Sequence, residues 1–441
     1  MKRRSFYEVL QMILRHFRGS GTLAASRMRC AREAARVPLP RCVLSCVAAL
    51  LFFAVRAEGK WSGDGWLLER PGAVPILFMS GTPEEMGRQH GALLKNLIAT
   101  TYSRILLVAG GYLYLKDDWF FDRIEEVERR VGAVLPDRFL RECDAMSAAA
   151  GLTRAQGRAL NLFPEMFHCS GIAARGKATR GGQVVHARVL DYMRDIGLQK
   201  TSVLQVFMPT GFNAWISVGF AGFNGTVTCM NEKGLAMGEM GGRGEGKWDG
   251  LPMSYLMRRV MEECATVEEA LALIRATPLT CTYYYVLSDA SGNLAAVEAD
   301  AGKPIQVLGP GEKHPLLGRT FEDVVYVTAP KRMPALVSRL EESYGRIDAD
   351  AMCAIVKRPV AMASNLHNAI FLPGTRDILF SIAGARSVAC DEPYDKVNLT
   401  ELLARYRAAR SRLRENPKAL TPSERSERTP YAWATRLPAT E

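Results

Sequence analysis

Three residues with complementary chemistry stand in the middle of the chain: Cys169, Arg188 and Asp191. A thiolate is a strong nucleophile, and a nearby guanidinium lowers the pKa of a thiol and so favours its thiolate form. A carboxylate beside them could hold a proton donor in place. These residue types predict nucleophilic catalysis at Cys169, although a cysteine at the start of a strand is more often a buried, unreactive side chain.

The segment between these residues predicts how they could meet. Two β-rich runs flank the sequence TRGG, which is typical of a hairpin. With Arg180-Gly181 as the turn, Ser170 faces Asp191, and the thiol, the cation and the carboxylate meet at one end of the hairpin. Residues three apart point to opposite faces of a regular strand, so the convergence of Arg188 and Asp191 requires a bulge or a strand end near Leu190.

Other residues offer alternatives. A papain-like Cys–His pair would need a histidine beside Cys169, and only His186 lies near it in the expected hairpin. The glycine-rich run Gly241–Gly246 lacks a following Lys-Ser/Thr, which argues against a phosphate loop. The cysteines are scattered, without a CxxC pair or a Cys/His cluster, so we expect no metal and no cofactor. The histidines considered are His90, His168, His186, His314 and His367.

The order of the motifs resembles a known family. Cys169-Ser170, a strand–turn–strand, Arg188-x-x-Asp191-Tyr192 and then Asn231–Leu235 are similar to the N-terminal-nucleophile (Ntn) hydrolases. Within them the chain is most similar to the cysteine enzymes of the isopenicillin N acyltransferase (acyl-CoA:6-aminopenicillanic acid acyltransferase) branch, relatives of choloylglycine hydrolase and acid amidases. The resemblance covers roughly residues 72–390. Three further segments agree with it: Gly81–Gly91, Thr277–Ser288 and Ser364–Ile370.

The resemblance implies a precursor that cuts itself between His168 and Cys169, which leaves Cys169 with a free α-amine. An unperturbed α-amino group has a pKa of about 7.7–8.0, which lies near working pH, so this amine can serve as the general base. By the same resemblance, Arg188 would hold the thiolate and its substrate, and Asp191 would orient the α-amine. Both residues lie three positions farther from the cysteine than in many relatives, which a longer turn would accommodate.

An oxyanion hole is also required, because charge develops on the carbonyl oxygen during attack by the thiolate. Relatives tend to carry an asparagine after the threonine of the strand VVYVTAP, whereas this chain has Ala329. The donor would then come from Asn224, Asn231 or Asn365. Each of these could instead be a turn residue or a strand-end cap.

The surrounding sequence predicts an α+β fold. Residues 58–168 are expected to be mainly helical, and β-rich runs begin at Cys169. Helices return over Leu251–Ala276, followed by a hairpin around Ala290-Ser291-Gly292. This order lacks the strict β–α alternation of a parallel sheet. The resemblance implies an Ntn-hydrolase-type four-layer αββα sandwich of antiparallel sheets with a helical N-terminal segment.

Charge and hydropathy divide the 441-residue chain into four parts. The net charge is +11, but residues 58–410 carry 40 basic and 40 acidic side chains, so nucleic-acid binding has little support. The apolar run Cys42–Val55, preceded by many arginines, predicts a signal peptide or a membrane anchor. The expected parts are a leader (1–57), a helical propeptide or light chain (58–168), the catalytic domain (169–410) and a disordered polar tail (411–441).

Together these features predict an exported enzyme, periplasmic or extracellular, and the alternative is an enzyme anchored to a membrane by residues 42–55 of the leader. It would transfer an acyl group from a small-molecule amide or thioester onto Cys169 and then to water or an amine. The alternative is a non-catalytic or peptidase-like relative that binds a lipid-like or peptide ligand, which Ala329 favours. The oligomeric state stays open.

Overall fold

The computed structural model describes residues 59–115, 119–162, 168–192, 194–241, 247–312 and 320–415. These residues fall within one compact unit, Gly59–Arg436. The expected leader, the tail beyond Glu415 and the glycine-rich stretch 242–246 lie outside the described residues. Within the described residues, no helix combines the length and the apolar character that crossing a bilayer requires.

A ten-stranded sheet forms one β-layer, in the order β1-β2-β3-β6-β7-β8-β9-β10-β11-β12. All neighbouring strands are antiparallel except β3 and β6, which run parallel. The aromatic and β-branched run of β10 suits a strand with neighbours on both sides. The strands are β1 (Gly59–Ser62), β2 (Gly65–Leu68), β3 (Ile76–Gly81), β6 (Ser202–Pro209), β7 (Trp215–Phe220), β8 (Thr228–Asn231), β9 (Ala236–Gly241), β10 (Thr282–Ser288), β11 (Leu294–Asp300) and β12 (Gln306–Leu308).

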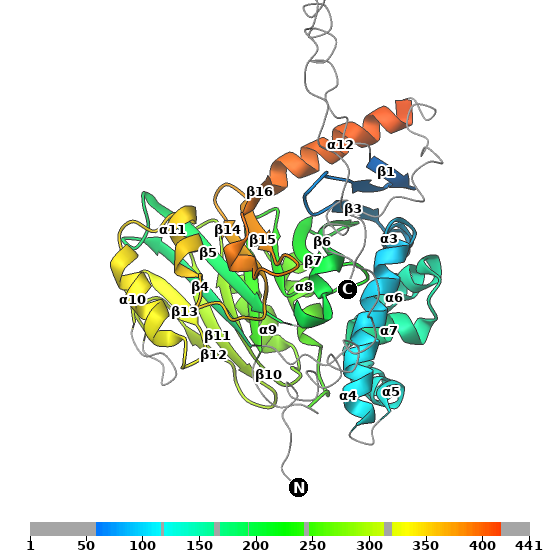
Figure 1. Ribbon diagram of the computed structural model, residues 1–441, viewed down its shortest axis with the longest axis horizontal. Helices are drawn as coiled ribbons and strands as arrows, with labels where there is room; N and C mark the ends of the chain where they lie inside the picture. Colours follow the sequence, from blue (N-terminus) through cyan, green and yellow to red (C-terminus); the bar gives the residue numbers. More distant parts are fainter. Residues whose placement is uncertain are drawn as a thin grey trace, which may run out of the picture. The chain divides into compact units, whose positions relative to one another are not determined.

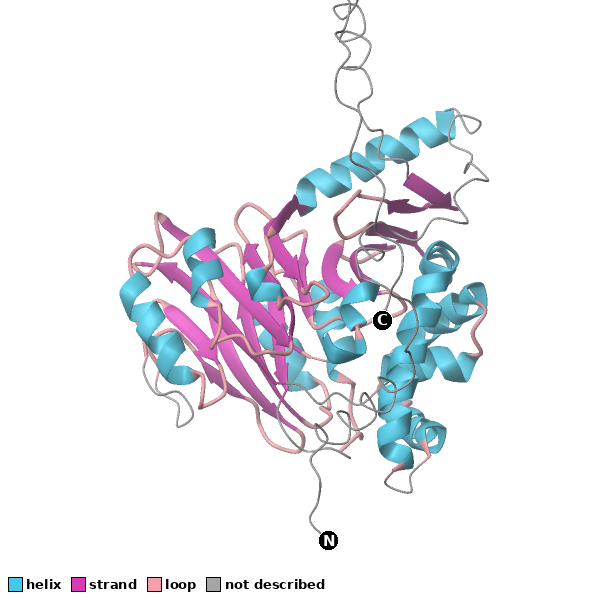
Figure 2. Cartoon of the chain, viewed as in Figure 1, coloured by secondary structure: helices cyan, strands magenta, loops and turns pink. Residues whose placement is uncertain are grey.

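A six-stranded sheet forms the second β-layer, in the order β13-β4-β5-β14-β15-β16, and it is antiparallel throughout. Its strands are seen as magenta arrows in Figure 2. They are β4 (His168–Gly176), β5 (Gly182–Asp191), β13 (Val324–Val327), β14 (Asn365–Leu372), β15 (Asp377–Ile382) and β16 (Asp395–Asn398).

A helical group follows β3. Helix α3 begins with a capping box, in which Thr82 and Glu85 bond each other's backbone amides. It packs closely on α6, because a Cβ at Gly87 or Gly91 would lie within 2.3 Å of an α6 carbonyl oxygen. The helices are α3 (Pro83–Ile105), the π-helical turn η1 (Leu106–Gly110), α4 (Gly111–Tyr114), α5 (Phe120–Val131), α6 (Asp137–Ala150) and α7 (Arg154–Leu162).

Later helices cover the outer faces of both sheets. The helices α8 and α9 share a core with the ten-stranded sheet, and α10 and α11 share a core with the six-stranded sheet. Figure 1 shows α10 and α11, in yellow, over strands β4, β5 and β13. The four-layer αββα arrangement expected from the sequence is therefore confirmed. The helices are α8 (Met253–Glu263), α9 (Val267–Ala276), α10 (Met333–Ser343), α11 (Ala349–Ile355) and α12 (Leu399–Glu415).

Small residues allow the two sheets to approach each other closely. A Cβ at Gly171 in β4 would lie 2.8 Å from the Met240 sulfur of β9. A Cβ at Gly238 in β9 would lie 2.7 Å from Cδ of Arg188 in β5. Contacts this short leave no room for a side chain, so these glycines bring β4 and β5 directly against β9.

Several expected elements are confirmed, and one segment differs. Helices α8 and α9 lie within the expected helical region Leu251–Ala276, and the expected hairpin around Ser291 joins β10 to β11. The segment 58–168 also contains β1, β2 and β3 ahead of its helices. These strands were not predicted, because each is short, and β3, which joins them to the rest of the sheet, pairs with β6 more than 100 residues away in the sequence.

Buried ion pairs join the helical group to the later part of the chain. Arg258 in α8 donates to both carboxylate oxygens of Glu142 in α6, at 2.8 and 2.5 Å. Arg258 also bonds Glu262 at 2.8 Å and the carbonyl oxygen of Asn224 at 2.7 Å. Both glutamates and the arginine are almost fully buried. Breaking such a pair would leave an uncompensated buried charge, which is strongly destabilising.

Because three histidines are buried, we expect the folded protein to lose stability in acid. Burial lowers the pKa of His90 and of His186 to about 3, and that of His367 well below its usual value. In the unfolded chain a histidine takes up a proton near pH 6.5, whereas the buried histidine stays neutral until about pH 3. The free energy of unfolding is therefore unaffected by this histidine above pH 6.5 and decreases as the pH falls from 6.5 towards 3. His90 and His186 should therefore each cost about 2 kcal/mol of stability at pH 5, and His367 acts in the same direction.

Urea unfolding at pH 7 and pH 5 measures this loss, and His90→Gln provides the test. His90 Nε2 accepts a hydrogen bond from the Gly222 amide at 2.9 Å, and a glutamine could keep an acceptor there without taking up a proton. The variant should lose about 2 kcal/mol less between the two pH values than the parent does. An equal loss in both proteins would show that His90 takes no part.

Candidate active site

The hairpin that carries Cys169 pairs two residues away from the expected register. His168, not Ser170, faces Asp191, and Cys169 pairs with Leu190 through its backbone. The turn is longer than predicted, since Gly176 pairs with Gly182 and the ladder is irregular between Ala174 and Gly176. A shift of two residues keeps every side chain on its expected face.

The longer turn is held by contacts with Asp323, which directly precedes the neighbouring strand β13. The Asp323 carboxylate accepts a hydrogen bond from the Lys177 amide at 2.8 Å, and the Asp323 carbonyl accepts one from the Arg175 amide at 2.9 Å. Thr179 forms a β-bridge with Ile347. These contacts hold residues 177–181 as a loop instead of extending the ladder to a tight turn at Arg180-Gly181.

Arg188 is completely buried between the two sheets. Its Nε donates to the carbonyl oxygen of Val227 at 3.2 Å, and Nη1 donates to that of Val189. Nη2 forms a salt bridge with Glu239 Oε2 at 3.3 Å. Three hydrogen-bond partners thus fix the guanidinium. Arg188 lies two residues before Leu190, the backbone partner of Cys169.

Glu239 is a candidate residue that was not predicted from the sequence. It stands in the middle of β9 and is completely buried. Burial raises the pKa of its carboxyl to about 7, and the positive charge of Arg188 acts in the opposite direction. The acidic residue within the otherwise apolar run AMGEMG is a signal that could have identified it.

Asp191 lies at the end of β5 and binds different groups. Its Oδ2 accepts a hydrogen bond from Arg332 Nη1 at 2.5 Å, and its Oδ1 accepts one from the Met362 amide at 2.9 Å. Burial raises the pKa of the Asp191 carboxyl, whereas Arg332, the Met362 amide and Arg188 lower it. Arg332 follows β13 and was also not predicted, because nothing in the local sequence distinguishes it from a surface arginine.

Arg188 and Asp191 therefore serve opposite faces of the six-stranded sheet. Arg188 reaches towards β9, whereas Asp191 reaches towards Arg332 and Met362. An irregularity is present close to Leu190, but it lies in the neighbouring strand β14, between Asn365 and His367. It does not turn the two side chains onto one face. The expectation that they meet at one point was wrong in this respect.

The three asparagines considered as oxyanion donors already have partners. Asn231 donates to the carbonyl oxygens of Met261 and Cys264 at 2.9 and 2.7 Å. Asn224 accepts a hydrogen bond from the Tyr255 hydroxyl at 2.9 Å. Both therefore hold α8 in place.

Asn365 is the asparagine that lies beside the candidate site. Its backbone pairs with Asp191, and its side chain donates to the Leu190 carbonyl at 3.1 Å and accepts from the Cys390 amide at 2.8 Å. The segment that carries Ala329 also borders the site, because Thr328 bonds the hydroxyl of Ser170 at 2.7 Å.

Two of the histidines, His186 and His367, form hydrogen bonds with hydroxyl groups. His186 pairs with Ala173 in the hairpin, and its Nδ1 lies 2.8 Å from the Ser288 hydroxyl. His367 Nε2 lies 2.9 Å from the Thr228 hydroxyl. Burial and the charge of Arg188 lower the pKa of both rings, so both are neutral at ordinary pH. His314 lies outside the described residues.

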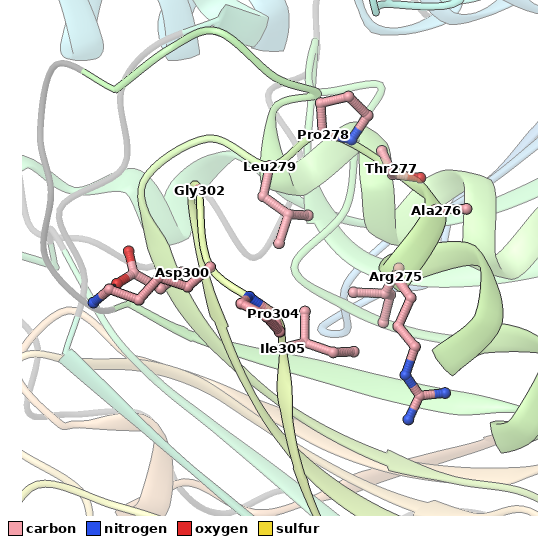
Figure 3. A pocket seen from close by; sticks show the side chains of 11 residues that line it. Arg275, Ala276, Thr277, Pro278, Leu279, Asp300, Gly302, Pro304 and Ile305 are labelled. Atoms are coloured by element: carbon pink, nitrogen blue, oxygen red, sulfur yellow. The ribbon is translucent and has the colours of Figure 1, made fainter.

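A cavity of about 580 Å³ opens elsewhere, between the end of α9 and the loop that follows β11. Figure 3 shows Leu279, Pro304 and Ile305 around it, with Asp300 and Arg275 at its sides. None of the candidate catalytic residues, asparagines or histidines considered above lines it, although Thr277–Leu279, the start of the segment Thr277–Ser288, does. Nor do the described residues contain a group of three or more His, Cys, Asp or Glu that could hold a metal ion.

Comparison with known proteins supports the resemblance found in the sequence. The model of the acyl-coenzyme A:6-aminopenicillanic acid acyl-transferase family matches residues 180–314. Protein dcd1B of Dictyostelium discoideum is 23% identical over 73% of this chain and 70% of its own length. The N-acylethanolamine-hydrolyzing acid amidase of Rattus norvegicus is 25% identical over 43% of this chain and 54% of its own length.

Among solved structures, the Caenorhabditis elegans ortholog of this amidase covers 47% of the chain and 93% of its own, at 19% identity and a TM-score of 0.39. Penicillin V acylase from Agrobacterium tumefaciens covers 53% and 87%, at 18% identity and a TM-score of 0.35. The resemblance to the acyltransferase branch of the Ntn hydrolases is confirmed by the family match, and the relatives include amide hydrolases.

Proposed function

We propose that the protein is a self-processing cysteine acyltransferase or amide hydrolase that forms an acyl-enzyme on Cys169. The observation that carries this proposal is the register of the hairpin. It sets the backbone of Cys169 against the end of β5, where the buried and fixed charges of Arg188 and Asp191 lie on either face. Buried charges that are fixed by several hydrogen bonds are common in active sites, where they stabilise charge that develops during the reaction.

The proposed reaction proceeds in two steps. Cleavage before Cys169 frees its α-amine, which takes the thiol proton. The thiolate attacks the carbonyl carbon of an amide, the C–N bond breaks, and the leaving nitrogen takes the proton from the α-ammonium group. Water or an amine then attacks the thioester and gives its proton to the α-amine. As the C–S bond breaks, the released thiolate takes that proton from the α-ammonium group and the thiol is restored.

In this proposal the charged residues have different roles. Arg188 supplies a fixed positive charge that favours the thiolate, and Glu239 positions its guanidinium. Asp191, held by Arg332, orients the α-amine. Ionic pairs on both faces of β5 would keep these charges in place while the substrate changes.

The proposal predicts a thioester on Cys169. Mixing the protein with an excess of an N-acyl amide and quenching in acid should give a Cys169 peptide heavier by the mass of the acyl group, as measured by peptide mass spectrometry. Cys353 is a matched control, because burial raises the pKa of its thiol to about 12 and it should stay unmodified. Amide turnover without any adduct on Cys169 would contradict the proposal.

The second candidate is a non-catalytic relative that binds a lipid-like or peptide ligand. Two observations favour it: Ala329 stands where relatives tend to have an oxyanion asparagine, and the side chains of Asn224, Asn231 and Asn365 are engaged in other hydrogen bonds. The same experiment separates the two candidates, since a binding protein would show neither an adduct nor turnover.

A further inference from the structure

Three basic side chains come together just beyond the end of β5. They are Arg104 at the end of α3, Arg194 in the 3-10 turn η2 (Arg194–Ile196) and Lys200 in the 3-10 turn η3 (Leu198–Thr201). We call these three residues the cationic cluster. Arg194 follows Asp191 by three residues, so the cluster adjoins the candidate active site. Each of the three side chains is partly exposed, and a small solute can therefore reach them.

Backbone contacts hold the cluster together. Arg104 Nη1 donates a hydrogen bond to the carbonyl oxygen of Ile196. The Gly197 amide donates to the carbonyl oxygen of Arg194 at 2.8 Å, and the Lys200 amide donates to that of Gly197 at 3.1 Å. Gly197 has a positive φ of 75°, and a Cβ there would overlap the Arg104 guanidinium. Glycine at this position therefore allows α3 to contact the chain between the two turns.

The donors of the cluster are only partly used. Nε and Nη1 of Arg194 and Nε of Arg104 are buried, and no described residue accepts a hydrogen bond from them. Burial lowers the pKa of Arg104 and, together with the charge of Arg104, that of Lys200. No carboxylate among the described residues acts on either group in the opposite direction. A buried guanidinium without a partner costs free energy, so we expect these donors to bind an anion.

We propose that the cationic cluster binds a phosphate group. The three unpaired N–H donors of two guanidinium groups suit the several acceptor oxygens of an oxyanion, and the lysine adds a further positive charge. A phosphate monoester carries a charge of about −1.5 to −2 at pH 7, which balances three cations better than a carboxylate with a single charge. The group is either a free phosphate ion or a phosphate carried by the amide substrate of the proposed reaction.

Calorimetric titration of the full chain with sodium phosphate measures the binding directly. At constant ionic strength we expect saturable binding that Arg194→Gln weakens at least about tenfold, because the variant loses two buried donors and their charge. Acetate should bind the parent at least about tenfold more weakly than phosphate does, since it carries one charge. Arg407→Gln is the matched control and should bind phosphate as the parent does, because Arg407 is exposed on α12, outside the cluster.

Urea unfolding separates a binding role of Arg194 from a structural one. Without phosphate, Arg194→Gln should be at least as stable as the parent, because the variant no longer buries an unpaired charge. Added phosphate should raise the urea midpoint of the parent and leave that of the variant nearly unchanged, since only the folded parent binds it. A variant that is less stable without phosphate, and that gains as much from phosphate as the parent does, would show that Arg194 supports the fold and binds no ligand.

Amide turnover identifies the source of the phosphate. If the phosphate belongs to the substrate, an N-acyl amide with a phosphate on its amine part should have a KM at least about tenfold lower than that of its neutral counterpart. Arg194→Gln should abolish this difference. If a free ion binds, the two amides should have equal KM values. Only this experiment rests on the proposed function: phosphate binding by a chain that turns over no amide would refute that function and leave the phosphate site intact.

Two calorimetric results would overturn the proposal. One is a heat of phosphate addition to the parent that equals the heat of sodium chloride addition at the same ionic strength, which would show that no specific site exists. The other is an equal affinity for phosphate in the parent and in Arg194→Gln, which would place the bound ion elsewhere on the molecule.

Discussion

Replacing Cys169 by alanine should leave a single uncut chain whose amide turnover is at least about 10³-fold lower, because the variant lacks both the thiolate and the proposed site of self-cleavage. Denaturing electrophoresis measures the first effect, and release of the free amine from an N-acyl amide measures the second. Cys353→Ala is the matched control and should be processed and active like the parent. Undiminished turnover in Cys169→Ala would rule out this cysteine as the nucleophile.

Removing the buried guanidinium should have the next largest effect. In Arg188→Met the thiol at position 169 loses the cation that favours its thiolate, so alkylation by iodoacetamide should slow and turnover should fall by about 10²-fold or more. The rate of alkylation is measured by mass spectrometry of the Cys169 peptide across a range of pH. The apparent pKa of that thiol should rise.

Two variants of Glu239 separate chemistry from folding. Glu239→Gln removes the salt bridge but leaves the bonds from Arg188 to the carbonyl oxygens of Val227 and Val189, so its loss of turnover should be much smaller. The double variant Arg188→Met/Glu239→Gln avoids an unpaired buried carboxyl and should recover stability but not activity. Equal alkylation of Cys169 in the parent and in Arg188→Met would show that Arg188 does not activate the thiol.

Local signals in the sequence predicted much of the fold. The capping box of Thr82 and Glu85 fixes the start of α3 through neighbouring residues only, and the hairpin of β10 and β11 depends on a short turn around Ser291. The register of the β4–β5 hairpin was predicted wrongly because its turn is held by Asp323, more than 140 residues farther along the chain. A contact between residues so far apart in the sequence cannot be predicted from the residues of the turn.

The distinction between local and long-range contacts also explains which site residues could be predicted from the sequence. Cys169, Arg188 and Asp191 lie within one short stretch with a recognisable spacing. Glu239 and Arg332 reach the site only because the two sheets pack face to face and because the chain returns after β13. Their contacts with Arg188 and Asp191 are fixed by tertiary packing.

The most direct test of the central claim, that Cys169 acts with a free α-amine, is the intact mass of the purified protein under denaturing conditions. The account predicts two chains, one of which has the mass of a polypeptide that begins at Cys169. Contacts such as the Arg258–Glu142 ion pair would hold the two chains together until the protein is denatured. A single chain that spans residues 168 and 169 and still hydrolyses amides would contradict the account.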